Sequence, residues 1–502
     1  EDEAFNVPMY SAKTLYDSLD AVGIKYNPMV KSVYEYVNPT GVTGGSGAGL
    51  GGSSGFEAGP YMQKLDEATA DSIEFAGGNY VPSDKSVLYG VESSFKNYDD
   101  AAIVVISRSG AEGADNATHG QDYDDGTDSW ENDPTVHYLE LQEYEKQLIA
   151  YAKTYFSKVV VLINSPAAME LGVLEDDPAI NSILWIGQPG YNGIMAVGEI
   201  LTGEVNPSGR LVDFYMRDFT TDPTFYNFGD NSQANGLIND NYTGNISLRN
   251  SAGEAGGGNV IDYVEGIYMG YRYYETVYAE LAAIDQQKAD EWYAEAVVYP
   301  FGYGLSYTTF EQEIKSVKVN GVDATENALT DADADATVTI TVTVKNTGEV
   351  AGKEVVQIYN DPSNTYDPDV DFEKAAANLV GFAKTPVIEA GESVDIDVEV
   401  PVKELADFDY MGSVAGDTWE GGYVLEAGSY VLSARADSHR VLDEVTLEAT
   451  DTITWDEDGN AETPNNIFSQ PLEDNATNVW APYNTLAHNW TVSGEDKYLK
   501  RH

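Results

Sequence analysis

The chain has 502 residues, of which 42% are hydrophobic and 22% are charged, so it has enough apolar residues for a packed core of two or three domains. Its 27 Lys and Arg against 84 Asp and Glu give a net charge of −57, which disfavours binding to nucleic acids and anionic membranes and favours a neutral partner such as a sugar. There is no cysteine, which excludes disulfides and thiolate catalysis, and no apolar run approaches the ~20 residues of a membrane-spanning helix.

The first half of the chain alternates helical patterns with short apolar runs. Residues 11–37 predict two short helices, and the glycine-rich stretch 41–55 predicts a flexible loop, since no strand leads into it. Three runs are β-rich and apolar on both faces, as buried parallel strands are: 101–107, 159–164 and 182–186. Helical patterns cover 138–155 and 190–203. This order predicts a parallel, doubly wound α/β domain over residues 1–310 that binds ligands at the carboxyl ends of its strands.

The second half changes to the alternating pattern of antiparallel strands. Residues 336–345 alternate strictly, and similar runs separated by turn residues follow at 354–359, 393–400 and 430–434. They predict an all-β sandwich, immunoglobulin-like or fibronectin-type-III-like, over residues 311–447. The polar remainder, 448–502, is interpreted as a C-terminal tail or linker.

Glu112 is the strongest candidate for a catalytic side chain. It lies in the segment 106–115 directly after the first predicted strand, with glycines at 110 and 113. A carboxylate on a loop at the carboxyl edge of an open α/β sheet can act on a ligand bound there. Position alone leaves open that Glu112 is a solvated loop acid.

Other motifs are weaker. The acidic stretch 122–131 lacks the full spacing of a calcium loop, so we interpret it as a plain acidic loop. The 5 histidines form no paired helical motif, and we therefore expect no metal and no cofactor. Ser208 lies between a proline and a glycine, which predicts a turn and not a nucleophile elbow.

Four separated motifs follow one another in a specific order. They are GQPGYNG at 187–193, EILTGEVNPSGRL at 199–211, GIYMGYRYY at 266–274 and YPFGYGLSYTTF at 299–310. Together they resemble the α/β sandwich domain of glycoside hydrolase family 3. The strings VKNTG and GKEVVQIY, at 344–348 and 352–359, are similar to the start of that family's fibronectin-type-III-like domain. The resemblance implies a retaining, exo-acting enzyme of the β-glucosidase type, which hydrolyses terminal non-reducing β-D-glucosyl residues.

The same resemblance implies roles for individual residues. In this family a loop of the sandwich domain supplies the general acid/base, and SRSGAEGAD at 107–115 is similar to that loop. Glu112 is then the acid/base, and Arg108, Asp115 and His119 are candidates that bind substrate or support Glu112. Each of these three is otherwise an ordinary loop residue.

One part of the family pattern is missing from the sequence. No stretch supplies the strand and helix repeats of the family's (β/α)-barrel, and the Ser-Asp-Trp-type nucleophile motif does not occur; the string at 128–130 has the order reversed. We assign no nucleophile to this chain and expect a barrel-bearing chain or a cleaved precursor fragment as its partner. Some members of the family have an inverted domain order, which the run 210–214 and the C-terminal residues suit.

Two alternatives stay open. The chain could be a non-catalytic scaffold, derived from the family, that binds carbohydrate or protein. It could also belong to a β-xylosidase or N-acetylglucosaminidase, because the barrel carries most of the family's sugar-binding residues. The composition leaves the compartment undecided, and a bacterial secreted or cell-surface protein is our working interpretation.

Overall fold

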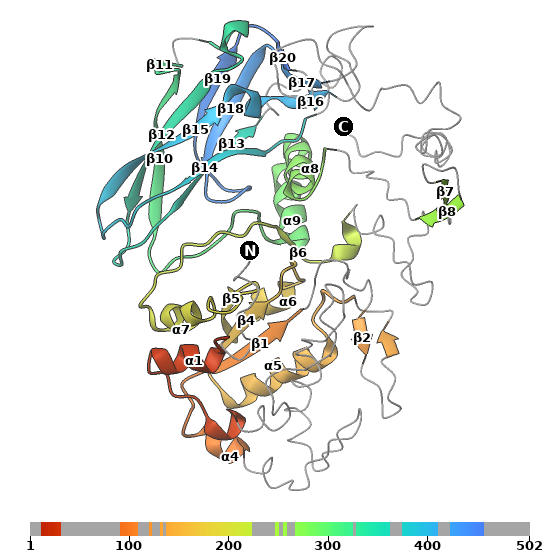
Figure 1. The fold of residues 1–502 in the computed structure, drawn as a ribbon, viewed down its shortest axis with the longest axis vertical. Coiled ribbons are helices and arrows are strands. Elements are labelled where there is room, and N and C mark those ends of the chain that lie inside the picture. Colours follow the sequence, from red (N-terminus) through yellow and green to blue (C-terminus); the bar gives the residue numbers. More distant parts are fainter. Residues whose placement is uncertain are drawn as a thin grey trace, which may run out of the picture. The chain divides into compact units, whose positions relative to one another are not determined.

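The computed structural model describes residues 12–31, 91–108, 120–122, 131–133, 137–222, 246–249, 255–258, 267–324, 328–361, 374–409 and 422–455. These residues form two compact units (Figure 1). The first contains the described residues up to Val205 together with Tyr215–Arg217, and the second contains the rest. Within the described part, no helix is both long and apolar enough to cross a membrane.

The first unit alternates helices and strands. Its elements are α1 (Leu15–Ala21), α4 (Val91–Phe95), β1 (Ala102–Ser107), β2 (Gly120–Asp122), β3 (Glu131–Asp133), α5 (Glu143–Tyr155), β4 (Val159–Asn164), α6 (Gly172–Glu175), β5 (Ile180–Trp185), α7 (Met195–Thr202) and β6 (Tyr215–Met216).

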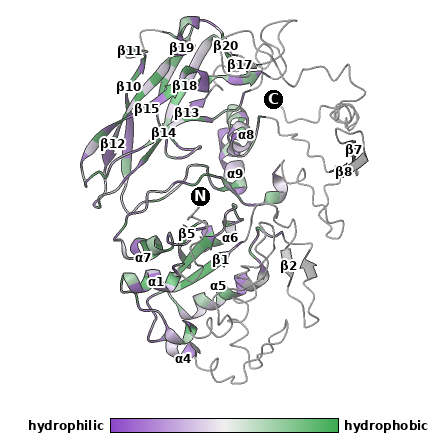
Figure 2. Cartoon of the chain, in the orientation of Figure 1, coloured by the Kyte–Doolittle hydropathy of each residue, from purple (hydrophilic) through white to green (hydrophobic). Residues whose placement is uncertain are grey.

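A parallel three-stranded sheet forms the centre of this unit, in the order β1-β4-β5. Ala102 lies opposite Val159 and Ser107 opposite Asn164, so the carboxyl ends of β1 and β4 are level. The strands β1 and β4 are apolar on both faces because helices flank the sheet: α1 and α7 lie side by side, and α5 lies along β1 (Figure 1). Figure 2 shows the contrast between hydrophobic β1 and the more polar α5.

The second unit is mostly antiparallel β-structure. Its elements are η4 (Phe219–Thr221), β7 (Ile246–Arg249), β8 (Ala255–Gly258), α8 (Tyr271–Ile284), α9 (Gln286–Ala296), β9 (Val297–Tyr299), β10 (Phe310–Val319), β11 (Val322–Asp323), η6 (Asp331–Asp333), β12 (Thr337–Asn346), β13 (Val355–Asp361), β14 (Asn378–Lys384), β15 (Ser393–Pro401), η8 (Val402–Leu405), β16 (Asp407–Asp409), β17 (Gly422–Leu425), β18 (Gly428–Arg435), β19 (Val441–Ala449) and β20 (Ile453–Trp455).

Two four-stranded sheets, β11-β10-β12-β15 and β14-β13-β18-β19, make up the sandwich, and β16-β17-β20 form a smaller sheet. The alternation predicted along β12 places Val338, Ile340, Val342 and Val344 in the core, where all four are fully buried. The core continues through Ile358 of β13 and Leu432 of β18 in the other sheet. A parallel α/β sheet followed by an all-β sandwich confirms the predicted fold class.

Several predictions concern details within this fold. The helix predicted over 138–155 begins only at Glu143, and the residues before it form a turn. The helices α8 and α9 belong to the second compact unit, although the sequence assigns them to the domain 1–310. The domain limits 1–310, 311–447 and 448–502 stay a prediction. The glycine-rich stretch 41–55 lies outside the described residues.

Candidate active site

Arg108 follows β1 directly and marks the carboxyl edge of the parallel sheet. Its backbone N–H donates to the Asn164 carbonyl at 3.0 Å, so the pairing of β1 with β4 extends to this residue. The side chains of Arg108 and of Glu145, in the first turn of α5, are 2% and 1% exposed. A charged pair at this depth requires partners for nearly every polar atom.

The guanidinium of Arg108 has acceptors for all of its donors. Nη1 and Nη2 donate to the two carboxylate oxygens of Glu145 at 2.6 and 2.7 Å. The other three bonds go to backbone carbonyls: Nε to Tyr138 at 2.6 Å, Nη1 to Ser107 at 2.8 Å and Nη2 to Glu140 at 2.8 Å. An arginine side chain has five N–H donors, and these contacts use them all. Arg108 is therefore bonded to the protein and not directed at a ligand.

Glu145 connects the start of α5 to the end of β1. Its Oε2 accepts the backbone N–H of Gln142 at 2.9 Å, and its own N–H donates to the Gln142 carbonyl at 3.0 Å, which closes the first helical turn. The same carboxylate forms the two parallel bonds to Arg108, the geometry in which arginine and carboxylate pair most strongly. Removing one member of such a buried pair costs about 3 to 5 kcal/mol, because the other charge is left without compensation.

The turn before α5 is held by further polar contacts. His137 Nε2 lies 2.8 Å from Glu170 Oε1, and the Gln142 side-chain amide donates to the His137 carbonyl at 3.1 Å. In the described part of the chain, His137, Glu140 and Glu170 form a group whose ligand atoms lie within 4.8 Å of one another, close enough to share a metal ion. Glu140 also lies 3.4 Å from Lys146 Nζ, so each of the three acidic or basic side chains has a partner in the protein.

The neighbouring strands end at the same edge. After β4, the Ser165 carbonyl accepts the indole N–H of Trp185 at 2.9 Å, which ties the end of β4 to the end of β5. Gly187 follows β5 with φ of 57°, and a Cβ there would lie 3.3 Å from the Trp185 ring. This is a physical reason for the glycine that opens the GQPGYNG motif. Gln188 and Tyr191 of the same motif are exposed.

In the second unit, two motifs of the sequence meet at Asn206 and Arg210. The Asn206 side-chain oxygen accepts from Ser306 Oγ at 2.9 Å and from the Tyr307 backbone N–H at 2.8 Å, and its amide donates to the Ala351 carbonyl. Arg210 pairs with Glu354 and donates to the Gly304 carbonyl. These motif residues thus attach the segments before the sandwich to its residues 351–354.

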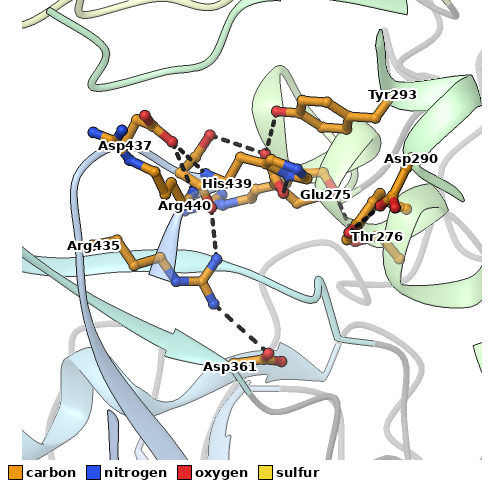
Figure 3. A network of polar contacts seen from close by, with 12 residues as sticks. Glu275, Thr276, Asp290, Tyr293, Asp361, Arg435, Asp437, His439 and Arg440 are labelled. Atoms are coloured by element: carbon orange, nitrogen blue, oxygen red, sulfur yellow. Dashed lines mark hydrogen bonds and ion pairs between the residues drawn. The ribbon is translucent and has the colours of Figure 1, made fainter. Parts of the chain in front are cut away.

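A buried network joins α8 and α9 to the sandwich (Figure 3). Glu275 of α8 accepts from Tyr293 of α9 at 2.6 Å and from Ser438 at 3.0 Å, and it lies 3.0 Å from Nδ1 of His439. The His439 ring stacks on Tyr293, with centroids 3.7 Å apart. Arg435 donates to the Ser438 carbonyl at 2.6 Å. Burial raises the pKa of the Tyr293 hydroxyl well above its ordinary value, helped by the nearby Glu275 carboxylate, so the tyrosine is the donor in this pair.

Among the sequence-predicted site residues, Arg108 is described, whereas Glu112, Asp115 and His119 lie outside the described residues. Glu145 was not predicted. The sequence contains a signal for it, because Gln142 and Glu145 have the spacing of a capping box at a helix start. This spacing would have placed the start of α5 correctly and marked Glu145 as an inward-facing acid.

Models of two domain families match parts of this chain. Residues 36–271 match the model of the glycosyl hydrolase family 3 C-terminal domain, and residues 354–438 match that of the fibronectin type III-like domain. Beta-glucosidase A of Butyrivibrio fibrisolvens is 31% identical over 386 residues, which cover 75% of this chain and 41% of that protein. The beta-glucosidase of Ruminococcus albus is 29% identical over 372 residues, or 74% of this chain and 30% of that protein.

A solved structure of a beta-glucosidase is also similar to this chain. The crystal structure of a beta-glucosidase from Paenibacillus barengoltzii aligns with a TM-score of 0.58 and 25% identity, over 88% of this chain and 38% of that one. The chain spans less than half the length of these three proteins. The predicted resemblance is confirmed: the chain belongs to glycosyl hydrolase family 3, of which it carries the C-terminal domain and the fibronectin type III-like domain.

Proposed function

We propose that this chain is the acid/base-bearing part of a retaining, exo-acting β-glucosidase. The substrate is a β-glucoside, from which the enzyme removes the terminal non-reducing β-D-glucosyl residue. A (β/α)-barrel, on a separate chain or a cleaved precursor fragment, supplies the nucleophile. Similarity to two β-glucosidases over about three quarters of the chain supports this proposal.

The observation that carries the proposal is the position of Arg108 at the end of β1. Glu112 follows it by four residues, so the two Cα atoms lie within about 14 Å of each other, the span of a fully extended segment. The carboxyl edge of a parallel α/β sheet is where such folds bind ligands. This short connection along the chain supports a role for Glu112 at that edge.

The chemistry assigned to Glu112 follows from retaining hydrolysis, which uses two carboxyl groups about 5 to 5.5 Å apart. Protonated Glu112 donates its proton to the leaving oxygen while the nucleophile attacks the anomeric carbon. The resulting Glu112 carboxylate then takes a proton from the water that cleaves the glycosyl-enzyme bond. To Asp115 and His119 we assign roles in binding the sugar or orienting Glu112.

A substitution at Glu112 tests this assignment in the enzyme together with its barrel. Glu112→Ala should lower kcat by orders of magnitude, and azide should restore turnover of activated aryl β-glucosides with formation of the β-glucosyl azide. Asp100→Asn is a matched control, since Asp100 is exposed and lies before the opposite end of β1. Full activity of Glu112→Ala would refute the assignment.

An inventory of the polypeptides in the active preparation tests the need for a barrel. Mass spectrometry and gel filtration should find a barrel of about 200 to 400 residues with this sequence, either as a second polypeptide or as a covalent continuation. An inactive preparation that holds these 502 residues alone would favour a non-catalytic scaffold. A panel of aryl glycosides distinguishes glucosidase from xylosidase or N-acetylglucosaminidase activity.

A further inference from the structure

The contacts of Arg108 bring together two parts of the chain that are far apart in sequence. From the end of β1, its guanidinium reaches the carbonyls of Tyr138 and Glu140, which lie 30 and 32 positions further along, and the carboxylate of Glu145, 37 positions further along. Between these parts lies segment 109–136, which contains Glu112. Both flanks of this segment are therefore bonded to one buried side chain.

An arginine near an active site can bind the substrate or hold other parts of the protein in place, and its hydrogen bonds distinguish these two roles. An arginine that binds a sugar hydroxyl needs a donor that points into the site. Arg108 has given its five donors to three carbonyls and one carboxylate, and its side chain is 2% exposed. The Tyr138 ring also covers the guanidinium of Arg108, whose carbon lies 5.3 Å from the ring centroid.

We infer that Arg108 and Glu145 are positioning residues, which fix the two ends of the segment that carries the general acid/base. This inference rests on the proposed function of Glu112. Neither side chain touches the substrate. Their effect on the reaction comes from where they hold the flanks of segment 109–136, at the end of β1 and at the first turn of α5.

The expected kinetic signature follows from the chemistry of the acid. A glycoside with a poor leaving group depends on proton donation to the departing oxygen, whereas an activated aryloxide leaves with little help. A displacement of about 1 Å in a reacting group can cost on the order of 100-fold in rate. Loosening the Arg108 pair should thus lower kcat/KM, which reports the step in which the leaving group departs, much more for a poor substrate than for an activated one.

Arg108→Lys is the principal variant, because lysine keeps the positive charge but lacks the planar fork that binds the carboxylate through two bonds. We expect kcat/KM for methyl β-D-glucoside to fall by about 10- to 100-fold and kcat/KM for 2,4-dinitrophenyl β-D-glucoside by less than about threefold. Glu145→Gln, which keeps the shape of the side chain and removes its charge, should show the same selectivity.

Arg217→Lys is the matched control. Arg217 also donates two bonds to one carboxylate, that of Asp176 at 2.7 and 3.3 Å, but these side chains are 29% and 64% exposed. Its rates on both substrates should equal those of the wild type. Thermal unfolding of every variant separates loss of fold from loss of rate.

The outcomes distinguish this inference from the proposal beneath it. If Glu112→Gln shows the leaving-group dependence and Arg108→Lys and Glu145→Gln do not, the pair serves stability and the positioning role is refuted. Equal loss on both substrates, or failure of both pair variants to fold, refutes it as well. If Glu112→Gln turns over methyl β-D-glucoside at the wild-type rate, the proposed function itself fails.

Discussion

Replacing Asp407 by asparagine should remove a pH-dependent loss of stability from the second unit. Burial raises the pKa of the Asp407 carboxyl from 3.8 to about 6; the charges of Lys374 and Arg272 oppose the rise, and that of Glu426 adds to it. The folded protein therefore holds this proton at pH values where the unfolded chain has lost it. The stabilisation is fully present below about pH 4 and is lost as the pH rises through 6.

The size of this effect follows from the two pKa values. A rise from 3.8 to about 6 corresponds to about 3 kcal/mol in total, at about 1.4 kcal/mol per unit. About 2 kcal/mol of it falls between pH 4.5 and 7.5, because this range begins about 1.5 pH units below the folded-state pKa; the remainder is lost below pH 4.5. The asparagine variant has no proton to lose, so its stability should fall by that much less across the range.

Urea unfolding at a series of pH values measures the difference between the wild type and Asp407→Asn. Since the net charge of −57 makes overall stability depend on pH as well, the comparison needs a variant with the same change of one charge. Glu399→Gln, at an exposed position on β15, provides it. If the curves of Asp407→Asn and wild type run parallel to within about 0.5 kcal/mol, the carboxyl is not held protonated and the reasoning is wrong.

Three further predictions test the packing. Glu145→Ala should lower the free energy of unfolding of the first unit by about 3 to 5 kcal/mol, since it leaves a buried guanidinium unpaired, and a loss below 1 kcal/mol in urea unfolding would contradict this. Gly302→Ala should lower Tm more than Gly391→Ala: φ is 81° and 79°, but the new Cβ would lie 2.1 Å from a side-chain oxygen at 302 and in open space at 391. Equal shifts would show that the crowding relaxes. Ile340→Ala, in the fully buried part of β12, should cost about 2 to 5 kcal/mol in the same unfolding assay, and a near-neutral result would mean that the core refills the space.

The strands could be predicted because their patterns depend on burial alone. The alternation of 336–345 matches a strand with one face in a sandwich core, and the uniformly apolar run 159–164 matches a strand covered on both faces. The start of α5 could not be placed in the same way, because Tyr138 and Leu141 continue the helical spacing. The helix begins at Glu143 because Glu145 binds the backbone of Gln142 and because the turn before it is held by Arg108, from another part of the chain.

Only part of the candidate site could be predicted from the sequence, for the same reason. The position of Arg108 after a buried strand is a local pattern, and it placed the residue at the sheet edge where the structure has it. That Arg108 pairs with Glu145 depends on a contact across 37 positions, which no local pattern contains. The assignment of α8 to the second unit likewise depends on the distant contact of Glu275 with His439.

The motifs that carry the family resemblance serve the scaffold in this chain. Gly187 allows the turn beside the Trp185 ring, Asn206 makes three hydrogen bonds across the second unit, and Arg210 pairs with Glu354. Such contacts depend on distance and shape within the fold, so they demand particular residues independently of any substrate. A general acid demands only a carboxyl group held near the leaving oxygen. For that reason the resemblance identifies the family firmly, while the proposed role of Glu112, and its proposed dependence on Arg108 and Glu145, are tested by the leaving-group comparison.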